Sequence, residues 1–548
     1  MELQLELETV DWLLIAAALI GLYAILLLPL RDSEVWKSRG ISVGSILGIP
    51  LAIFFRTTRG LDLLDRLARP KLFWRLVASA GIPLVVLSMA YFLMLVLLMT
   101  FLMIQEPPEP SSYNEPRNIL LIPGLNEYIP FLWGWIALFV TLLVHEFAHG
   151  ILSRVEGVRV KSMGIVTVLI APIAAFVEPD DEELFGGKDR PPLVDKRARI
   201  RILSAGVISN FIVAAAAMAL FFGPVIGAIS PVDRLIVVDV EENSEAQEDG
   251  YAMGMVLMQA NGRDVSNLQQ FYQDLAGASD QGKQSLLFKD RADTLTVTGQ
   301  PQQGILVGSI FKDSGAYQAG LPANSVITEI DGQKTADLAG FRELMNSTRP
   351  GQVVNITTAQ GRTYPINLTA RDDASVEQGG FIGIAISGNA VFSGGATFQE
   401  APARQFLEQL RALPGMGMSG FHLMLSLPFA GVPGLSQKGF PGFSGWLTAV
   451  FEPSGWAEPL GEKLFWIANL LLWIGWINLY AGLFNCLPAV PLDGGHIFRD
   501  LVQSGFERIV RAEEAERLTR TTVAILTWLV LTSLLITIIA PFTNGLSI

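Results

Sequence analysis

A pair of histidines four residues apart, with a glutamate directly after the first, is the group in this chain best suited to do chemistry. The residues are His145, Glu146 and His149. On an α-helix this i, i+4 spacing brings both imidazoles to one face, as a zinc ion bound at about 2.0 to 2.1 Å per nitrogen requires. The carboxylate of Glu146 is then available as a general base. A chance match on an ordinary core helix is the alternative interpretation.

The stretch that contains these residues, 131–152, is hydrophobic and long enough to cross a bilayer. Two imidazoles and a carboxylate are costly to bury in hydrocarbon unless they face a protein-lined cavity and are paired or bind a metal. The sequence therefore predicts a metal site inside a membrane.

The composition supports a membrane protein that carries soluble modules. Of its 548 residues 50% are hydrophobic and only 17% are charged, and the mean hydropathy is +0.41, which is too apolar for a soluble protein of several domains. Six hydrophobic stretches are long enough to span a bilayer: 12–30, 76–104, 131–152, 202–222, 464–487 and 521–539. The expected fold is a polytopic α-helical membrane protein with about six transmembrane helices and an inserted pair of small α+β domains.

The loop charges predict the orientation of these spans. Lys and Arg are concentrated in 31–75, in 154–201 and in 499–520, and such loops face the cytoplasm. The N- and C-termini and the acidic stretch 224–463 are then outside, and the metal site lies towards the cytoplasmic side of the cell membrane. The net charge of -13 belongs mostly to the outer part and indicates no nucleic-acid partner.

A third metal ligand has to come from a distant part of the chain. Asp493 stands at the predicted inner end of the fifth span, at the depth of the two histidines. Pro488 and Pro491 break the preceding helix, and the two glycines after Asp493 let the backbone turn back, an irregularity that a membrane tolerates only beside a cavity. Alternatively, these residues simply end one helix and Asp493 caps the next. His422, in the outer part, is not expected to be a ligand.

The motif His145-Glu146-x-x-His149 together with Asn485-x-x-Pro488-x-x-x-x-Asp493-Gly494 resembles the motif pair of the site-2 protease family of intramembrane zinc metalloproteases. Residues 204–210, Ser-Ala-Gly-Val-Ile-Ser-Asn, are similar to a small-residue motif of that family, with Val207 where the family usually has Pro. Residues 164–178 resemble its membrane-embedded β-hairpin, for which a short buried helix is the alternative. The resemblance covers 127–223 and 460–505.

The resemblance implies that His145, His149 and Asp493 hold zinc, that Glu146 is the general base, and that the enzyme hydrolyses peptide bonds in transmembrane segments of membrane proteins. Asn210 and Asn485 are amides on nearly apolar spans. They are suited to position an unwound substrate backbone, although each could equally join helices by hydrogen bonds.

An internal repeat with an offset of seventy residues lies between the fourth and fifth spans. Ser244 falls on Ser314, and Asn261-Gly262 falls on Asp331-Gly332, a strong signal for a tight turn. Two copies of one small α+β module explain this, and they resemble PDZ domains, the second copy more closely. Such domains add a peptide strand to a sheet edge, so the pair could bind substrate tails or act as a size filter. A purely structural pair is the alternative.

The predicted organisation follows from these features. It comprises an N-terminal transmembrane pair with a cytoplasmic loop (1–126), the first part of the catalytic core (127–223), two PDZ-like modules (233–300 and 301–373), an outer interfacial segment (374–460), the second part of the core (461–505) and the last transmembrane helix (506–548).

Two other functions remain open at this point. A noncatalytic membrane scaffold could bind peptide tails through the modules, although it would have no physical need for a general base beside two ligands. A zinc prenyl-protein protease shares the first motif, but it would take its third ligand from a Glu on a later helix. The substrate and the oligomeric state are not predicted.

Overall fold

The structure is a computed structural model, and it describes residues 18, 20–31, 33–46, 48–108, 115–119, 121–168, 171–187, 190–277, 284–290, 293–335, 337–370, 379–429 and 439–542. The chain forms two compact units. The first comprises Met1–Leu220 and Leu470–Ile548, and the second comprises Phe221–Asn469. Each unit is described by itself.

Within the described residues, five helices are long and apolar enough to cross a membrane. They are α4 (Lys71–Gln105), α6 (Phe131–Glu156), α8 (Lys196–Leu220), α15 (Lys463–Asn485) and α17 (Ala512–Ile539). These helices match five of the six predicted spans. The predicted span 12–30 lies largely outside the described residues, and its described part, Ile20–Arg31, is a shorter apolar helix.

Short helices connect or flank the long ones in the first unit. They are α2 (Glu34–Ser38), α3 (Leu61–Leu67), α5 (Pro116–Ile119), α7 (Asp181–Phe185) and α16 (Asp493–Phe506). Of these, α16 follows α15 and begins at the predicted metal ligand.

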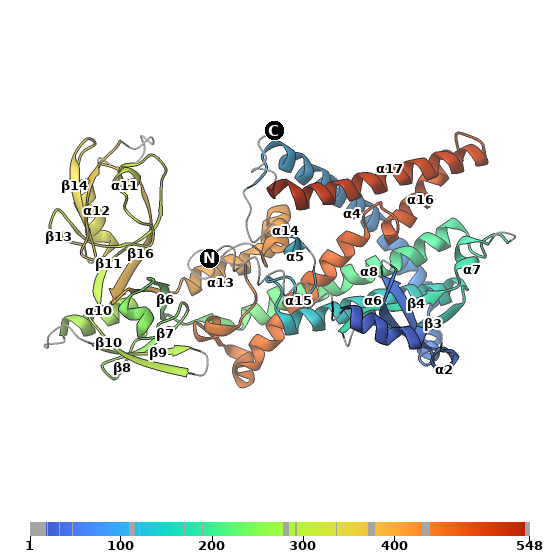
Figure 1. The fold of residues 1–548 in the computed structure, drawn as a ribbon, viewed down its shortest axis with the longest axis horizontal. Coiled ribbons are helices and arrows are strands. Elements are labelled where there is room, and N and C mark those ends of the chain that lie inside the picture. The colour runs from blue at the N-terminus through green and yellow to red at the C-terminus, as the bar shows by residue number, and fades with distance from the viewer. Residues whose placement is uncertain are drawn as a thin grey trace. The chain divides into compact units, whose positions relative to one another are not determined.

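A four-stranded antiparallel sheet packs beside α6 in the order β1 (Ile41–Ile46), β2 (Ile49–Thr57), β3 (Val160–Val168) and β4 (Ala171–Pro179) (Figure 1). The hairpin β3–β4 confirms the hairpin predicted for 164–178 and excludes the short-helix alternative, while its place in the membrane stays a prediction. The hairpin β1–β2 lies in the predicted loop between the first two spans and was not anticipated. Two β-branched runs on either side of Gly48 were its signal.

Helix α8 is the central helix of the first unit and packs against α4, α6 and α16. Its residues Ser204, Ala205 and Gly206 are small, and the first two are buried at 0% and 4% exposure. Small side chains let helix backbones approach closely where apolar attraction between helices is weak, as it is in a bilayer. The composition of α8 therefore explains how it contacts three helices at once.

A buried ion pair joins α8 to α16. Arg199 donates from Nε to Asp500 Oδ2 at 2.5 Å and from Nη2 to Oδ1 at 2.9 Å, and the two side chains are 7% and 0% exposed. The two-point geometry compensates the desolvation of both charges and fixes the rotation of α16 about its axis. Because Asp500 lies two turns after Asp493, this pair also helps to set the position of the predicted ligand.

A second ion cluster joins the ends of α4, α6 and α8. The carboxylate of Glu156, 4% exposed, accepts hydrogen bonds from Arg201 Nε at 2.7 Å and from Arg75 Nη2 at 3.0 Å. The charged ends of these helices therefore lie together.

The second unit contains the predicted repeat. Three pairs of elements correspond, with first residues seventy positions apart: α9 (Glu245–Glu248) with α11 (Gly315–Gln318), β7 (Val256–Ala260) with β12 (Val326–Ile330), and α10 (Leu268–Gly277) with α12 (Leu338–Asn346). Ser244 and Ser314 cap the first helix of each copy, each accepting a backbone N–H at 3.2 Å. Asn261 and Asp331 both adopt a positive φ in the predicted tight turns. The repeat is therefore confirmed.

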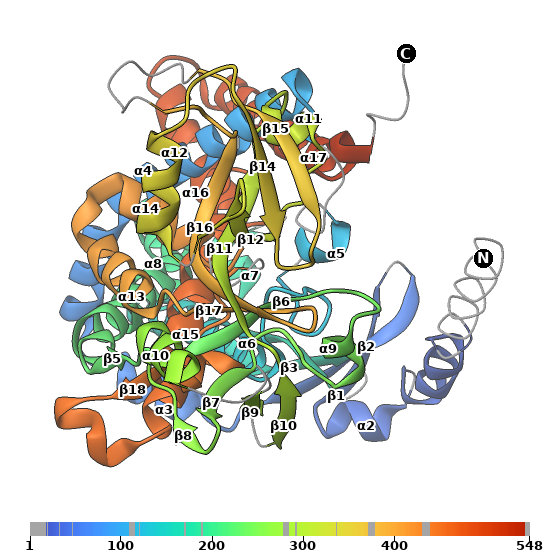
Figure 2. The same ribbon diagram turned by 90° about the vertical axis from the view of Figure 1, so that its left-hand side faces the viewer.

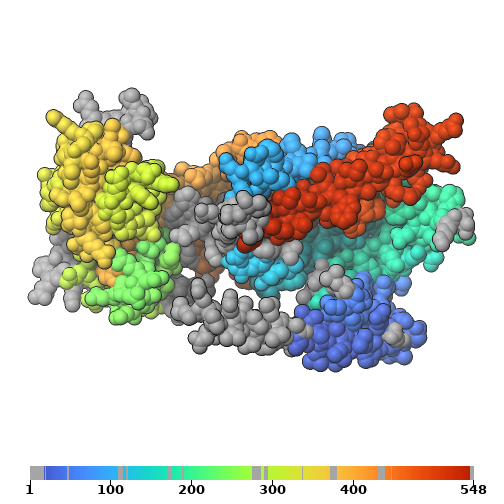
Figure 3. Space-filling view, turned by 45° about the horizontal axis from the view of Figure 1, so that its top comes forward, coloured from blue at the N-terminus to red at the C-terminus, as the bar shows by residue number. Residues whose placement is uncertain are grey.

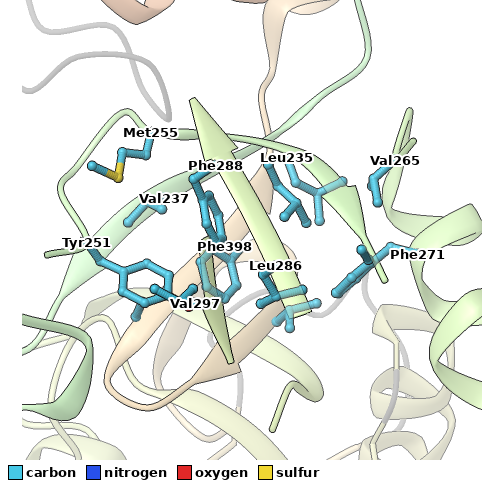
Figure 4. Close-up of a cluster of buried hydrophobic side chains, with 14 of the residues drawn as sticks. Leu235, Val237, Tyr251, Met255, Val265, Phe271, Leu286, Phe288, Val297 and Phe398 are labelled. Atoms are coloured by element: carbon cyan, nitrogen blue, oxygen red, sulfur yellow. The ribbon is translucent and has the colours of Figure 1, made fainter. Parts of the chain in front are cut away.

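Each copy has its own hydrophobic core, and Figure 4 shows that of the first. Phe271, Phe288 and Phe398 are fully buried there, and the last two rings stack at a centroid distance of 5.3 Å. Phe398 comes from a strand far beyond the repeat itself, so the core of the first copy needs a later part of the chain.

A single twelve-stranded sheet contains the strands of both copies (Figure 2). Besides β7 and β12 these are β6 (Leu235–Val240), β8 (Arg263–Asp264), β9 (Gln284–Asp290), β10 (Asp293–Gly299), β11 (Gln302–Ile310), β13 (Gln333–Lys334), β14 (Val353–Thr358), β15 (Thr363–Asn367), β16 (Ile384–Ser393) and β17 (Ala396–Glu400). The hairpin β16–β17 joins the copies, because β16 pairs with β11 and β17 pairs with β6. The modules thus extend to residue 400, into the predicted outer segment 374–460.

The rest of the second unit includes helices α13 (Ala403–Ala412) and α14 (Gly417–Ser426) and the two-stranded pair β5 (Ile229–Pro231) and β18 (Phe451–Pro453). Phe443 is central to its aromatic cluster, with ring contacts to Phe440, Phe451 and Phe465. The interfacial role expected for this part stays a prediction.

Replacing Asp500 by Ala is expected to lower the free energy of unfolding by about 3 to 5 kcal/mol, because it leaves the Arg199 charge buried without a partner. Unfolding by SDS in mixed micelles measures this change. The double variant Arg199→Met with Asp500→Leu should recover most of it. As a control, Asp65→Ala breaks the half-exposed pair with Arg154 and should cost at most about 1 kcal/mol. Equal losses for Asp500→Ala and the control would contradict this interpretation of the buried pair.

Candidate metal centre and catalytic site

Three predicted ligands from two helices meet in the first unit. His145 and His149 lie on α6, and Asp493 is the first residue of α16. Asp493 Oδ2 is 3.1 Å from His145 Nε2 and 3.3 Å from His149 Nε2, and the two Nε2 atoms are 3.2 Å apart. Among the described residues, these three side chains form the one cluster of His, Cys, Asp and Glu able to hold a metal ion.

The size of this triangle fits zinc. Ligands arranged tetrahedrally at about 2.0 to 2.1 Å from a zinc ion lie about 3.3 Å from one another. All three edges are close to that value. Asp493 Oδ2 is also buried and has no hydrogen-bond partner among the described residues, as expected for an oxygen that faces a cation.

The other nitrogen of His149 fixes the tautomer of its ring. Nδ1 lies 2.8 Å from the carbonyl oxygen of Ile202 on α8. Since that oxygen can only accept, Nδ1 carries the proton and Nε2 keeps its lone pair for a metal.

Asn210 occupies the equivalent position beside His145. Its amide nitrogen is 3.1 Å from His145 Nδ1, and its Oδ1 is buried without a hydrogen-bond partner among the described residues. A half-turn of the amide exchanges the two atoms, so that Oδ1 accepts from Nδ1–H and His145 Nε2 is free for a metal. The amide therefore joins α8 to a predicted ligand on α6, which is the interhelical alternative named for it, and its expected contact with substrate stays a prediction.

Gly206 on α8 lies directly against both imidazoles. A Cβ atom at this position would be 2.4 Å from His149 Nε2 and 2.7 Å from His145 Nε2. Real Cβ atoms essentially never come so close to another heavy atom, so glycine leaves room here for the two imidazoles. This contact explains why the motif 204–210 needs a small residue at Gly206: the helix backbone lies directly against the two imidazoles.

Two glycines help to place Asp493. A Cβ on Gly494 would be 2.3 Å from the carbonyl oxygen of Cys486, and one on Gly495 would be 2.5 Å from the carbonyl carbon of Ala489. Neither glycine has a positive φ, so their role is close packing of α16 on the segment after α15, not the turn that the sequence analysis expected.

Glu146 lies on α6, is half-buried and contacts the four-stranded sheet. Its Oε2 accepts a hydrogen bond of 3.0 Å from the backbone N–H of Val177 on β4, the outer strand of the sheet. The contact fixes one carboxylate oxygen and leaves Oε1 for proton transfer, as a general base requires.

Asn485, the other candidate for contact with substrate, and the two remaining histidines lie elsewhere. Asn485 is half-buried at the last residue of α15, and its expected contact with substrate stays a prediction. His496 faces the ring of Phe185 at a centroid distance of 5.5 Å, and His422 belongs to the second unit. Two contacts could not be predicted from the sequence. One is the hydrogen bond from His149 to the carbonyl oxygen of Ile202, because every residue has a backbone carbonyl and the sequence does not mark this one. The other is the close approach of Gly206 to both imidazoles.

Among known families, the model of the one described as peptidase family M50 matches residues 133–529. Similar proteins include an uncharacterized protein of Methanocaldococcus jannaschii, 29% identical over 49% of this chain and 64% of that protein. A putative zinc metalloprotease of Neisseria meningitidis is 25% identical over 66% of this chain and 88% of its own length. The regulator of sigma-E protease RseP of Escherichia coli is 26% identical over 47% and 67%, respectively.

Replacing Gly206 by Ala is expected to abolish stoichiometric zinc binding, because the added methyl group takes the place of the imidazole nitrogens. Elemental analysis of the purified protein measures the zinc. Gly505→Ala on α16 is the matched control, since a Cβ there meets nothing within 4 Å. Full zinc content in Gly206→Ala would contradict the assigned geometry.

Replacing Asn210 by Ala should lower zinc affinity roughly 10- to 100-fold, the usual effect of losing a group that orients a metal ligand. Competition with a chelating dye measures the affinity. Asn210→Asp keeps an acceptor for His145 Nδ1–H and should retain most of it. Asn478→Ala on α15 is the control, because that amide donates within its own helix, to Ile474. Unchanged affinity in Asn210→Ala would rule out an orienting role.

Proposed function

Because the chain belongs to peptidase family M50 and is an intramembrane zinc metalloprotease, we propose that His145, His149 and Asp493 bind its zinc ion and that Glu146 is its general base. The observation that carries this proposal is the triangle of ligand atoms with edges of 3.1, 3.2 and 3.3 Å. Three acceptor atoms this close repel one another unless a cation lies between them.

Zinc supplies Lewis acidity at this position, lowering the pKa of water and polarising the scissile carbonyl. The surrounding residues transfer the protons and orient the groups that do so. Glu146 takes the proton of the attacking water on Oε1 and passes it to the nitrogen of the leaving amine. The hydrogen bond from Val177 N–H to Oε2 holds the carboxylate in one orientation during both transfers.

In this proposal Asn210 orients His145, as the carbonyl of Ile202 orients His149. Both partners lie on α8, so one helix sets the direction of both imidazole ligands. Asn485, at the end of α15, is the remaining candidate to hold the substrate backbone. Its position close before Asp493 in the chain supports that role.

The substrates are transmembrane segments of other membrane proteins. The carbonyl groups of a spanning helix are occupied by its own hydrogen bonds, so the segment has to unwind locally before hydrolysis. We assign the water-accessible side to the cytoplasm. In support, the carbonyl that binds His149 belongs to Ile202, the residue after Arg201 in the ion cluster with Glu156, and basic loops favour that side.

The two modules of the second unit are PDZ-like in this proposal and lie outside the cell membrane. Corresponding helices and strands of the two copies begin seventy residues apart, which supports two copies of such a module. Because β16–β17 joins both copies into one sheet, the pair would act as one body that admits substrates with short outer tails and excludes bulky ones. The purely structural alternative predicts cleavage independent of tail size.

Replacing Glu146 by Gln is expected to leave zinc bound and to lower the rate of cleavage by at least about 10²- to 10⁴-fold, because the amide cannot accept the proton. The assay reconstitutes the enzyme with a single-span test protein that has a short outer tail, and mass spectrometry locates the cut.

Glu513→Gln, an exposed change on α17, is the control and should cleave as the wild type does. Failure of the zinc-loaded wild type to cut a panel of such spans would favour a scaffold that binds peptide tails. Equal rates for the wild type and Glu146→Gln would remove Glu146 from the mechanism.

A further inference from the structure

A cavity of about 1090 Å³ lies in the first unit and does not include the metal ligands. Its walls come from the segment before α8, from α16 and from α17. The first turn of α8 also lines it, and α8 and α16 are the two helices joined by the buried ion pair. Arg199 is both a cavity residue and the partner of Asp500.

The charges around this cavity are mainly positive. Four cationic side chains line it, against two carboxylates, Asp195 and Glu516. The cations are Lys196, Arg199, Arg499 and Arg520. Asp195 is already occupied, because it caps α8 by accepting the backbone N–H of Ala198 at 2.7 Å. Because Lys196 pairs with Glu507 and Arg199 pairs with Asp500, the cations left to attract an anion are Arg499 and Arg520.

Arg499 and Arg520 are the cations best placed to bind such an anion. Arg499 lies over the ring of Phe185 at 5.3 Å and no closer than 3.7 Å to Asp500, whose carboxylate is held by Arg199. Arg520 pairs with Glu516 one turn earlier, and their side chains are 80% and 63% exposed. An exposed pair of this kind is worth little, so Arg520 can turn to an anion at small cost.

The lining of the cavity becomes apolar further along α17. Along α17 the lining residues change from Glu516 and Arg520 to Val523, Ala524 and Trp528. Trp528 is 69% exposed, and Figure 3 shows α17, in red, at the surface along its length. One cavity thus offers cationic groups at one end and an apolar surface continuous with a membrane-spanning helix at the other.

We propose that this cavity binds an anionic phospholipid, with the phosphate between Arg499 and Arg520 and an acyl chain along Val523 and Trp528. Basic pockets between transmembrane helices bind anionic headgroups in this way, and the apolar wall distinguishes a lipid from a free phosphate ion. The proposal is independent of the proteolytic mechanism. It does connect the two sites in space, since Thr527 on the same wall accepts the backbone N–H of Val490, three residues before Asp493.

Native mass spectrometry of the delipidated protein in detergent tests the proposal. The protein is titrated with palmitoyl-oleoyl phosphatidylglycerol, with the matching phosphatidylcholine and with inorganic phosphate. The first phosphatidylglycerol should bind roughly tenfold or more tightly than phosphatidylcholine. Equal affinity for both lipids would overturn the proposal, and so would phosphate that displaces phosphatidylglycerol at similar concentration, because the site would then hold a free anion.

Two variants locate the bound lipid. The double variant Arg499→Gln with Arg520→Gln should lose the preference for phosphatidylglycerol. Arg508→Gln with Arg517→Gln removes the same charge from exposed positions outside the cavity lining and should keep the preference. If both double variants lost the preference equally, the preference would depend only on the net charge of the protein, and the assignment of the lipid to this cavity would be overturned.

Ala524→Trp keeps every arginine and fills the apolar part of the cavity. It should lower lipid affinity while the zinc content stays at the wild-type level, which also verifies that the protein is folded. Unchanged phosphatidylglycerol binding in this variant would place the lipid elsewhere.

Discussion

Two imidazoles and a carboxylate remain stable in the interior of a membrane protein only while a cation and hydrogen bonds offset the loss of water, and the first unit is organised around this requirement. The acceptor atoms of His145, His149 and Asp493 point at one another within 3.3 Å. Their outer atoms are supported by α8, through Ile202 and Asn210. Without a cation this arrangement would bring like lone pairs together, so the geometry is informative about the metal even before chemistry is considered.

Helix α8 meets the requirement with small residues and with charge. Gly206 lets the helix backbone come against the ligands, and Arg199 fixes the helix that carries Asp493 by a buried pair with Asp500. The same helix therefore orients both histidines and positions the third ligand. The first turn of this helix also lines the cavity for which we propose lipid binding, so α8 contacts both sites.

Local patterns in the sequence predicted a large part of this structure. The five described spans, the residues that meet in the predicted metal site and the seventy-residue repeat each follow from periodicity, motif spacing or self-similarity. Pairings between distant segments could not be predicted in this way. The strands β1 and β2 join the β3–β4 hairpin, β16–β17 joins the two repeats, and Asn210 faces His145, because tertiary packing decides which edges and side chains meet. The glycines after Asp493 were identified, but their role is close packing and not a turn.

The zinc content of the purified protein, wild type beside Asp493→Ala, tests the central claim most directly. Preparation without chelators and elemental analysis should give one zinc per chain in the wild type and a much lower content in the variant, because two histidines alone complete neither the charge nor the geometry of the site. Equal zinc in both proteins, or none in the wild type, would contradict a site built from α6 and α16 together.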